Sequence, residues 1–171
     1  MKNKAKIETR PFNGAHVVIH SNHSYDEVLD RLRSLMGTNV RDVAALAKQP
    51  ISEAEFVRQV EDRYVGKSAF MFFTEIDHGG WLPKFGIKQR SVRWIIGNPL
   101  LAITMIRHDI TAGLFAPVEL LVTENNDQCG ATVTYVQPSS LMLIEENPPL
   151  LAAAKALDEK LAALIAAATD D

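Results

Sequence analysis

Residues 117–136, Pro-Val-Glu-Leu-Leu-Val-Thr-Glu-Asn-Asn-Asp-Gln-Cys-Gly-Ala-Thr-Val-Thr-Tyr-Val, decide the fold. One side of the first half is apolar at alternate positions: Val118, Leu120 and Val122. This alternation indicates a strand over residues 117–124 with one buried face. The turn-forming residues 125–128 follow, and alternation resumes over residues 130–136. The stretch therefore predicts a β-hairpin and, with it, an antiparallel sheet.

Further strands are expected before this hairpin, at residues 15–20, 68–76 and 91–96. Four consecutive large apolar residues, Phe70 to Phe73, indicate that the second of these strands is buried on both faces. The third strand places Val92, Trp94 and Ile96 on one face and Arg93 and Ile95 on the other.

Three helices are predicted from cap residues and apolar periodicity. Ser24 and Glu27 form a capping box, and Gly37 ends the helix that they begin. Asn98 caps a short helix that is apolar nearly all round, so we expect that helix to be largely buried. Residues 147–168 form a terminal helix with an apolar seam, which we expect to pack on its own chain.

These elements predict a single α+β domain over residues 1–171. It has two layers, an antiparallel sheet with helices packed on one face. Residues 38–66 are expected to be an inserted, highly charged segment of two short helices, and residues 147–168 the terminal helix.

Composition limits the classes of function. The chain has 18 Lys and Arg against 21 Asp and Glu, a net charge of −3, so a general nucleic-acid-binding protein is not expected. The sequence has one cysteine, Cys129, which excludes an intramolecular disulfide and a four-cysteine zinc site. No apolar run is long enough to cross a bilayer, and no signal-like apolar segment follows the basic start. We therefore expect a cytoplasmic protein without a membrane partner.

Four short stretches occur in an order and spacing typical of one family. They are Ser24-Tyr25-Asp26-Glu27, Glu75-Ile76-Asp77-His78, Gly97-Asn98-Pro99, and Leu114-Phe115-Ala116-Pro117-Val118-Glu119-Leu120-Leu121-Val122 with Val133-Thr134-Tyr135-Val136-Gln137-Pro138. Through them, residues 12–141 resemble the DUF302 family, a bacterial and archaeal group without an assigned function. The resemblance implies a TATA-binding-protein-like α+β fold and a homodimer, without implying nucleic-acid binding.

The chain departs from this family pattern at three places. It carries the insertion at residues 38–66 and the terminal helix, and it has Gly79-Gly80-Trp81 where small, alanine-rich residues are usual. We therefore do not carry a site geometry over from the family.

The pair Asp77–His78 is the leading candidate for chemistry, because it follows a buried strand and precedes a glycine loop. An imidazole at such a position serves as a general acid or base. The alternative is that Asp77 caps the following turn and His78 binds backbone groups. Neighbouring residues of a strand point to opposite faces, so Asp77 need not orient His78.

Three more residues are candidate ligand contacts. Asn98 begins a helix whose free N–H groups suit an anion, although simple N-capping explains an asparagine there equally well. Trp81 in the glycine loop is interpreted as a lid or an interface anchor. Tyr135 is expected to line an apolar pocket, with core packing as the alternative.

Other polar residues suggest no further site. His16 and His20 share a strand face about 13 Å apart, too far to ligate one zinc ion, so no metal site is predicted. No cofactor can be named, because nucleotide-binding and nucleophile motifs are absent from the sequence. Arg93 is expected to pair with Glu119 across the sheet, the alternative being a ligand carboxylate.

Three functions remain open at this stage. The first is a small-molecule-binding protein whose pocket lies between the strand ends and the buried helix. The second is an enzyme with His78 as general acid or base and the Asn98 helix end stabilising negative charge. The third is a homodimeric interaction module without a site. The first two require the His78 imidazole and the Asn98 helix end to meet around one hollow.

Overall fold

The computed structural model describes residues 5–126 and 129–170. The strands are β1 (His16–Ser21), β2 (Met71–Asp77), β3 (Ser91–Gly97), β4 (Val118–Glu124) and β5 (Ala131–Val136). The helices are α1 (Tyr25–Leu35), α2 (Val40–Leu46), α3 (Glu53–Arg63), α4 (Pro99–Ile106), α5 (Pro138–Met142) and α6 (Pro148–Thr169). Two 3-10 helices, η1 (Leu82–Phe85) and η2 (Ile110–Phe115), complete the set.

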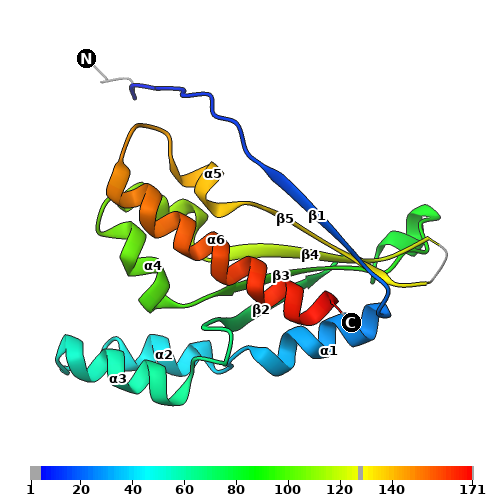
Figure 1. Cartoon of the computed structure of the whole chain (residues 1–171), viewed down its shortest axis with the longest axis horizontal. Helices are drawn as coiled ribbons and strands as arrows, with labels where there is room; N and C mark the ends of the chain where they lie inside the picture. Colours follow the sequence, from blue (N-terminus) through cyan, green and yellow to red (C-terminus); the bar gives the residue numbers. More distant parts are fainter. Residues whose placement is uncertain (1–4, 127–128, 171) are drawn as a thin grey trace.

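The five strands form one antiparallel sheet in the order β1-β5-β4-β3-β2. Helices α1 and α6 lie side by side across one face of this sheet (Figure 1). The predicted α+β class, with an antiparallel sheet and helices on one face, is confirmed. The β4–β5 hairpin also has the predicted strands. Asp127 and Gln128 of its predicted turn lie outside the described residues.

The main core fills the space between the sheet and these two helices. The strands contribute the fully buried Trp94 and Leu120 to this core, and α1 and α6 contribute Leu32 and Leu161. These are the alternate strand residues and the helix seams that the sequence indicated. The terminal helix thus packs on its own chain, as predicted.

The capping box that predicted α1 is present. The Ser24 hydroxyl accepts a hydrogen bond from the Glu27 N–H, and the Glu27 carboxylate accepts one from the Ser24 N–H (2.9 Å). Such reciprocal caps satisfy two backbone donors that the first helical turn leaves without partners. The cap therefore fixes where β1 gives way to α1.

Helices α2 and α3 occupy the 38–66 segment and have a small core of their own. Val43, Leu46 and Val60 pack with Met71 at the start of β2. The backbones of Gly37 and Gly66 approach so closely here that a Cβ on either would overlap main-chain atoms. Only glycine permits this approach, which ties the helical segment to the end of the sheet.

Two expectations about burial were wrong. Strand β2 lies at the edge of the sheet, so its second half, from Thr74 to Asp77, is exposed rather than buried on both faces. Helix α4 is only partly buried: Met105 is inaccessible, but Ile103 is 43% exposed. Its apolar composition all round had suggested deeper burial, but α4 packs at the end of the sheet beside η2 and α6.

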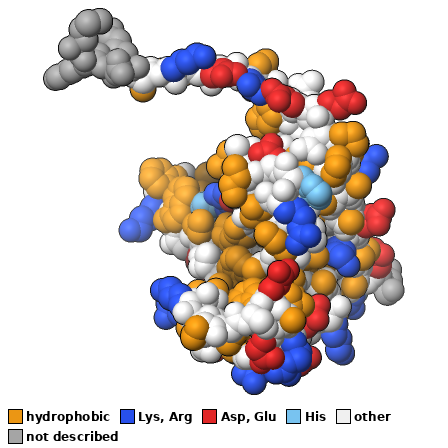
Figure 2. All heavy atoms as spheres, turned by 90° about the vertical axis from the view of Figure 1, so that its left-hand side faces the viewer, with side chains coloured by type: hydrophobic (Ala, Val, Ile, Leu, Met, Phe, Trp, Pro, Cys, Tyr) orange, Lys and Arg blue, Asp and Glu red, His pale blue; other side chains and the backbone are white. Residues whose placement is uncertain are grey.

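The sheet face turned away from α1 and α6 carries the other alternate residues. One row across it runs Val18, Thr134, Leu121, Arg93 and Ile76. We call this surface the open face. On the side of the molecule drawn in Figure 2, hydrophobic side chains gather around a hollowed part of the surface. None of the helices in the described part of the chain combines the length and apolar character needed to cross a bilayer.

Candidate functional site

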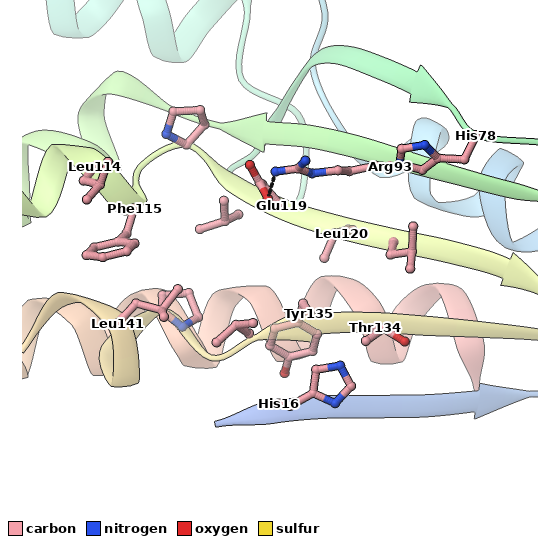
Figure 3. Close-up of a pocket in the computed structure, with 15 residues that line it drawn as sticks. His16, His78, Arg93, Leu114, Phe115, Glu119, Leu120, Thr134, Tyr135 and Leu141 are labelled. Atoms are coloured by element: carbon pink, nitrogen blue, oxygen red, sulfur yellow. Dashed lines mark ion pairs between the residues drawn. The ribbon is translucent and has the colours of Figure 1, made fainter. Parts of the chain in front are cut away.

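A hollow of about 530 Å³ lies on the open face. Its walls come from every strand except β2, from η2 and α5, and from His78 just after β2 (Figure 3). The lining residues are His16, His78, Arg93, Leu114, Phe115, Pro117, Val118, Glu119, Leu120, Leu121, Thr134, Tyr135, Val136, Pro138 and Leu141. We call this cavity the open-face hollow.

An ion pair lies in the middle of the hollow. Arg93 of β3 stands opposite Leu121 of β4, and Glu119 precedes Leu121 by two residues, so the two charged side chains share one face. The Arg93 guanidinium donates to the Glu119 carboxylate (Figure 3). The side chains are 40% and 49% exposed, so water and ligands reach both. The predicted cross-strand pair is confirmed.

His78 forms one side of the hollow. Its N–H donates to the Ser91 carbonyl (3.0 Å), which fixes the position of the residue directly after β2. The half-buried imidazole lies beside the Arg93 side chain (Figure 3). The Trp81 ring meets it edge-to-face at 5.8 Å, and Phe85 meets Trp81 in the same manner at 6.0 Å. A chain of rings therefore leads from the hollow to the tip of the β2–β3 loop.

The other side of the hollow is apolar. Leu114 and Phe115 of η2 stand at one end, near Leu141 of α5 (Figure 3). Leu114 is 81% exposed, so its side chain is available to a ligand. The hollow thus combines one ion pair and two imidazoles, those of His16 and His78, with an apolar end.

Asp77 does not face this hollow. It stands opposite Val92, on the helix-covered face, whereas His78 follows on the other face. The Asp77 carboxylate accepts a hydrogen bond from the Gly80 N–H (3.1 Å). The turn-capping alternative therefore describes Asp77, and its carboxylate does not orient His78.

Asn98 lies at the opposite end of the β2–β3 hairpin from His78. His78 adjoins Ser91 at the start of β3, whereas Asn98 follows Gly97 at its end, so roughly 20 Å of strand separates them. The expectation that these two groups meet around one hollow is wrong. Antiparallel neighbours joined by a loop at one end place the residues after each strand at opposite ends.

The amide of Asn98 has two structural partners. Its Oδ1 accepts from the Leu100 N–H (2.8 Å), and its Nδ2 donates to the Ala69 carbonyl (3.0 Å). Asn98 therefore caps α4 and ties it to the segment before β2. The residue also touches a second cavity of about 140 Å³, which is otherwise lined by apolar side chains such as Leu101 and Met105.

Tyr135 reaches the edge of the open-face hollow from the helix-covered side. It stands opposite Val17, on the face that packs on the helices, and it is partly buried. Burial raises the pKa of its hydroxyl, and the nearby Asp158 carboxylate of α6 raises it further. The neutral phenol is thus the stable form, and Tyr135 belongs as much to the core as to the hollow.

The histidines of the open face do not gather around a metal position. Across residues 5–126 and 129–170, no three His, Cys, Asp or Glu side chains come together in a metal-binding arrangement. His20 is bound locally, with its Nδ1 3.0 Å from the Thr132 Oγ1. His16 lines the hollow from the start of β1.

The apolar lining was not foreseen. Leu114, Phe115 and Leu141 come from η2 and α5, two short elements without a clear periodic pattern. Thr134 and Leu121 could have been found from strand alternation, because they are the outward residues of the predicted β4–β5 hairpin. Strand alternation in the sequence could therefore predict the sheet residues that line the hollow, but not the lining residues from η2 and α5.

The sequence of the chain also matches a protein-family model. Residues 45–168 match the model described as "Domain of unknown function DUF302". The chain belongs to the DUF302 family. The match includes α3, which lies in the 38–66 segment, and almost all of α6. The expectation that this segment and the terminal helix depart from the family pattern is therefore wrong. It starts within α2 and so does not include the Ser24 capping box.

Solved structures support the same assignment of the fold. This DUF302 protein is similar to the crystal structure of an uncharacterized conserved protein DUF302 from Bacillus stearothermophilus, with a TM-score of 0.62. The identity is 16%, over 90% of this chain and 97% of the other. That likeness concerns the fold alone. No curated protein matches the chain.

Proposed function

We propose that this DUF302 protein binds a small amphipathic molecule in the open-face hollow. The observation that carries the proposal is an accessible ion pair, Arg93 with Glu119, at the centre of a cavity with an apolar end. Ligand sites typically combine mostly apolar walls with a few polar groups that orient the ligand.

The size of the hollow fits this function. Small-molecule sites commonly enclose about 300–1,000 Å³, and the hollow measures about 530 Å³. The cavity at Asn98 measures about 140 Å³ and has one polar lining side chain, so it suits a ligand less well. The open-face hollow is therefore preferred to the site expected beside α4.

Catalysis by His78 has weaker support. A general acid or base is usually oriented by a second polar group within hydrogen-bond reach. Among the described residues, no side chain forms a hydrogen bond with the His78 imidazole; its closest ring partner is Trp81. The arrangement favours His78 as a ligand contact over His78 as a proton-transfer group.

The proposal can be tested by ligand-observed NMR with a set of small aromatic and aliphatic acids, amines and amides. Leu121→Trp places a larger side chain on the floor of the hollow, where the partly exposed Leu121 leaves room for it. The matched control, Ile103→Trp, changes an exposed residue of α4. Fragments are expected to bind wild type and the control but not Leu121→Trp. The absence of any bound fragment, or binding that Leu121→Trp leaves unchanged, would refute the proposal.

A homodimer is a second candidate, favoured by exposed apolar residues at both ends of the open face. Phe85 is 73% exposed at one end, and Ile110 and Leu114 are 77% and 81% exposed at the other. Large apolar side chains exposed to this extent are typical of protein interfaces. Sedimentation equilibrium should show a dimer that Phe85→Ser and Leu114→Ser weaken, and a monomer at every concentration would contradict this candidate.

A further inference from the structure

We propose, building on the proposed function, that the ligand of the open-face hollow is a zwitterion with an apolar substituent. The chemical class is that of a free hydrophobic amino acid, with one ammonium and one carboxylate group. The inference comes from the charge arrangement of the hollow rather than from its size.

The permanent charges of the lining balance each other. Arg93 and Glu119 are the lining residues with a permanent charge, one of each sign, and they neutralise each other. A ligand with a single negative charge would add a second carboxylate beside Glu119, so that two negative charges share one guanidinium. A ligand with a single positive charge would add a second cation beside Arg93, so that two positive charges share one carboxylate. Covering such an unbalanced charge is unfavourable because the charge loses water without gaining a full partner.

A zwitterion avoids this loss. Its carboxylate can accept from the guanidinium while its ammonium donates to the Glu119 carboxylate, so each charge on the floor keeps an opposite neighbour. The guanidinium has five N–H donors and each carboxylate oxygen accepts more than one hydrogen bond, so the ion pair need not separate. Both side chains are about half exposed, which leaves these positions accessible.

The lining of the hollow is polar at one end and apolar at the other. Figure 3 shows Arg93 and Glu119 between two different ends, with His78 on one side and Leu114, Phe115 and Leu141 on the other. An apolar substituent beside the charged groups would extend toward the leucines and the phenylalanine. Burial of that substituent supplies the hydrophobic part of the binding energy.

The test uses three probes that share a phenyl ring and differ in charge. L-Phenylalanine is the zwitterion, 3-phenylpropionate has the carboxylate alone, and phenethylamine has the amine alone. Isothermal titration calorimetry on the full chain at pH 7 compares their dissociation constants. We expect L-phenylalanine to bind at least about tenfold more tightly than either singly charged probe.

Two variants assign the charges. Glu119→Gln should abolish the preference for L-phenylalanine over 3-phenylpropionate, and Arg93→Gln should abolish its preference over phenethylamine. Both residues are half exposed, so neither change removes core packing. The matched control is Arg58→Gln, which breaks an exposed ion pair with Glu55 on α3 and should leave all three affinities unchanged.

The outcomes separate this inference from the proposed function. Equal or tighter binding of a singly charged probe by wild type overturns the zwitterion. Binding of none of the three probes, while other fragments still occupy the hollow, also overturns it and leaves the proposed function standing. If neither the probes nor the fragments bind, both the ligand class and the proposed function fail.

Discussion

Tyr25 should make this protein lose stability at high pH in a measurable way. The residue is 6% exposed at the start of α1, and the pKa of its hydroxyl is raised to about 12 from an ordinary value of 10.0. Burial is the largest cause of the raised pKa. Arg90, whose guanidinium lies 4.2 Å from the ring centroid, acts in the opposite direction, and the carboxylates of Asp77, Asp26 and Glu75 contribute to the rise. The folded state therefore holds the phenol proton more tightly than the unfolded state does.

The size of the effect follows from these two pKa values. Below pH 10 the phenol is protonated in both states and the full stability is present. As the pH rises toward 12 the unfolded state ionises first, so the free energy of unfolding falls. At pH 11 ionisation of Tyr25 favours the unfolded state over the folded state about tenfold, which lowers the free energy of unfolding by about 1.4 kcal/mol.

Urea unfolding of wild type and Tyr25→Phe between pH 8 and pH 11 measures this loss. Other groups titrate in both proteins, so the difference between their unfolding free energies isolates Tyr25. Wild type should lose roughly 1–1.4 kcal/mol more than the variant over this range. A difference that stays constant with pH, or changes in favour of wild type, would show that the folded state does not hold the Tyr25 proton.

Three other substitutions test separate parts of the structure. Gly130→Ala should lower the free energy of unfolding by about 1–3 kcal/mol, because Gly130 has a φ of 88° and an added Cβ would overlap a main-chain oxygen. The control is Gly113→Ala, whose added Cβ makes only ordinary contacts and should leave the free energy of unfolding nearly unchanged. Thermal unfolding measures both variants. Asn98→Ala should lower the free energy of unfolding by about 1–2 kcal/mol through loss of the helix cap, yet leave fragment binding intact. A loss of fragment binding in this variant would show that Asn98 contributes to the ligand site. Trp81→Phe should remove nearly all iodide quenching of fluorescence, since Trp81 is 47% exposed and Trp94 is fully buried; persistent quenching would contradict this placement.

Local patterns were sufficient to predict most of the secondary structure. The Ser24 capping box marks α1, and alternation in β4 and β5 marks the hairpin, because these signals depend on neighbours only a few residues away. The Arg93–Glu119 pair was also predictable, since strand alternation places both on one face. Elements without such periodicity, η1, η2 and α5, were missed.

The position of the site depended on a relation between strands. Strands β2 and β3 follow each other in the chain and pair antiparallel, which alone separates His78 from Asn98. That relation was available from the sequence once the antiparallel sheet was predicted. The apolar end of the hollow was not, because Leu114 and Leu141 meet only when η2 and α5 pack together. Contacts between distant short elements arise from tertiary packing rather than from local preference.

The most direct test of the central claim is a ¹H–¹⁵N NMR titration of the labelled full chain with L-phenylalanine. If the open-face hollow is the ligand site, the amide signals of Leu121, Thr134 and His78 should shift together in a saturable manner, while those of Leu101 and Ala102 beside Asn98 stay in place. Shifts confined to Leu101 and Ala102 would place binding at the other end of the sheet and contradict the account.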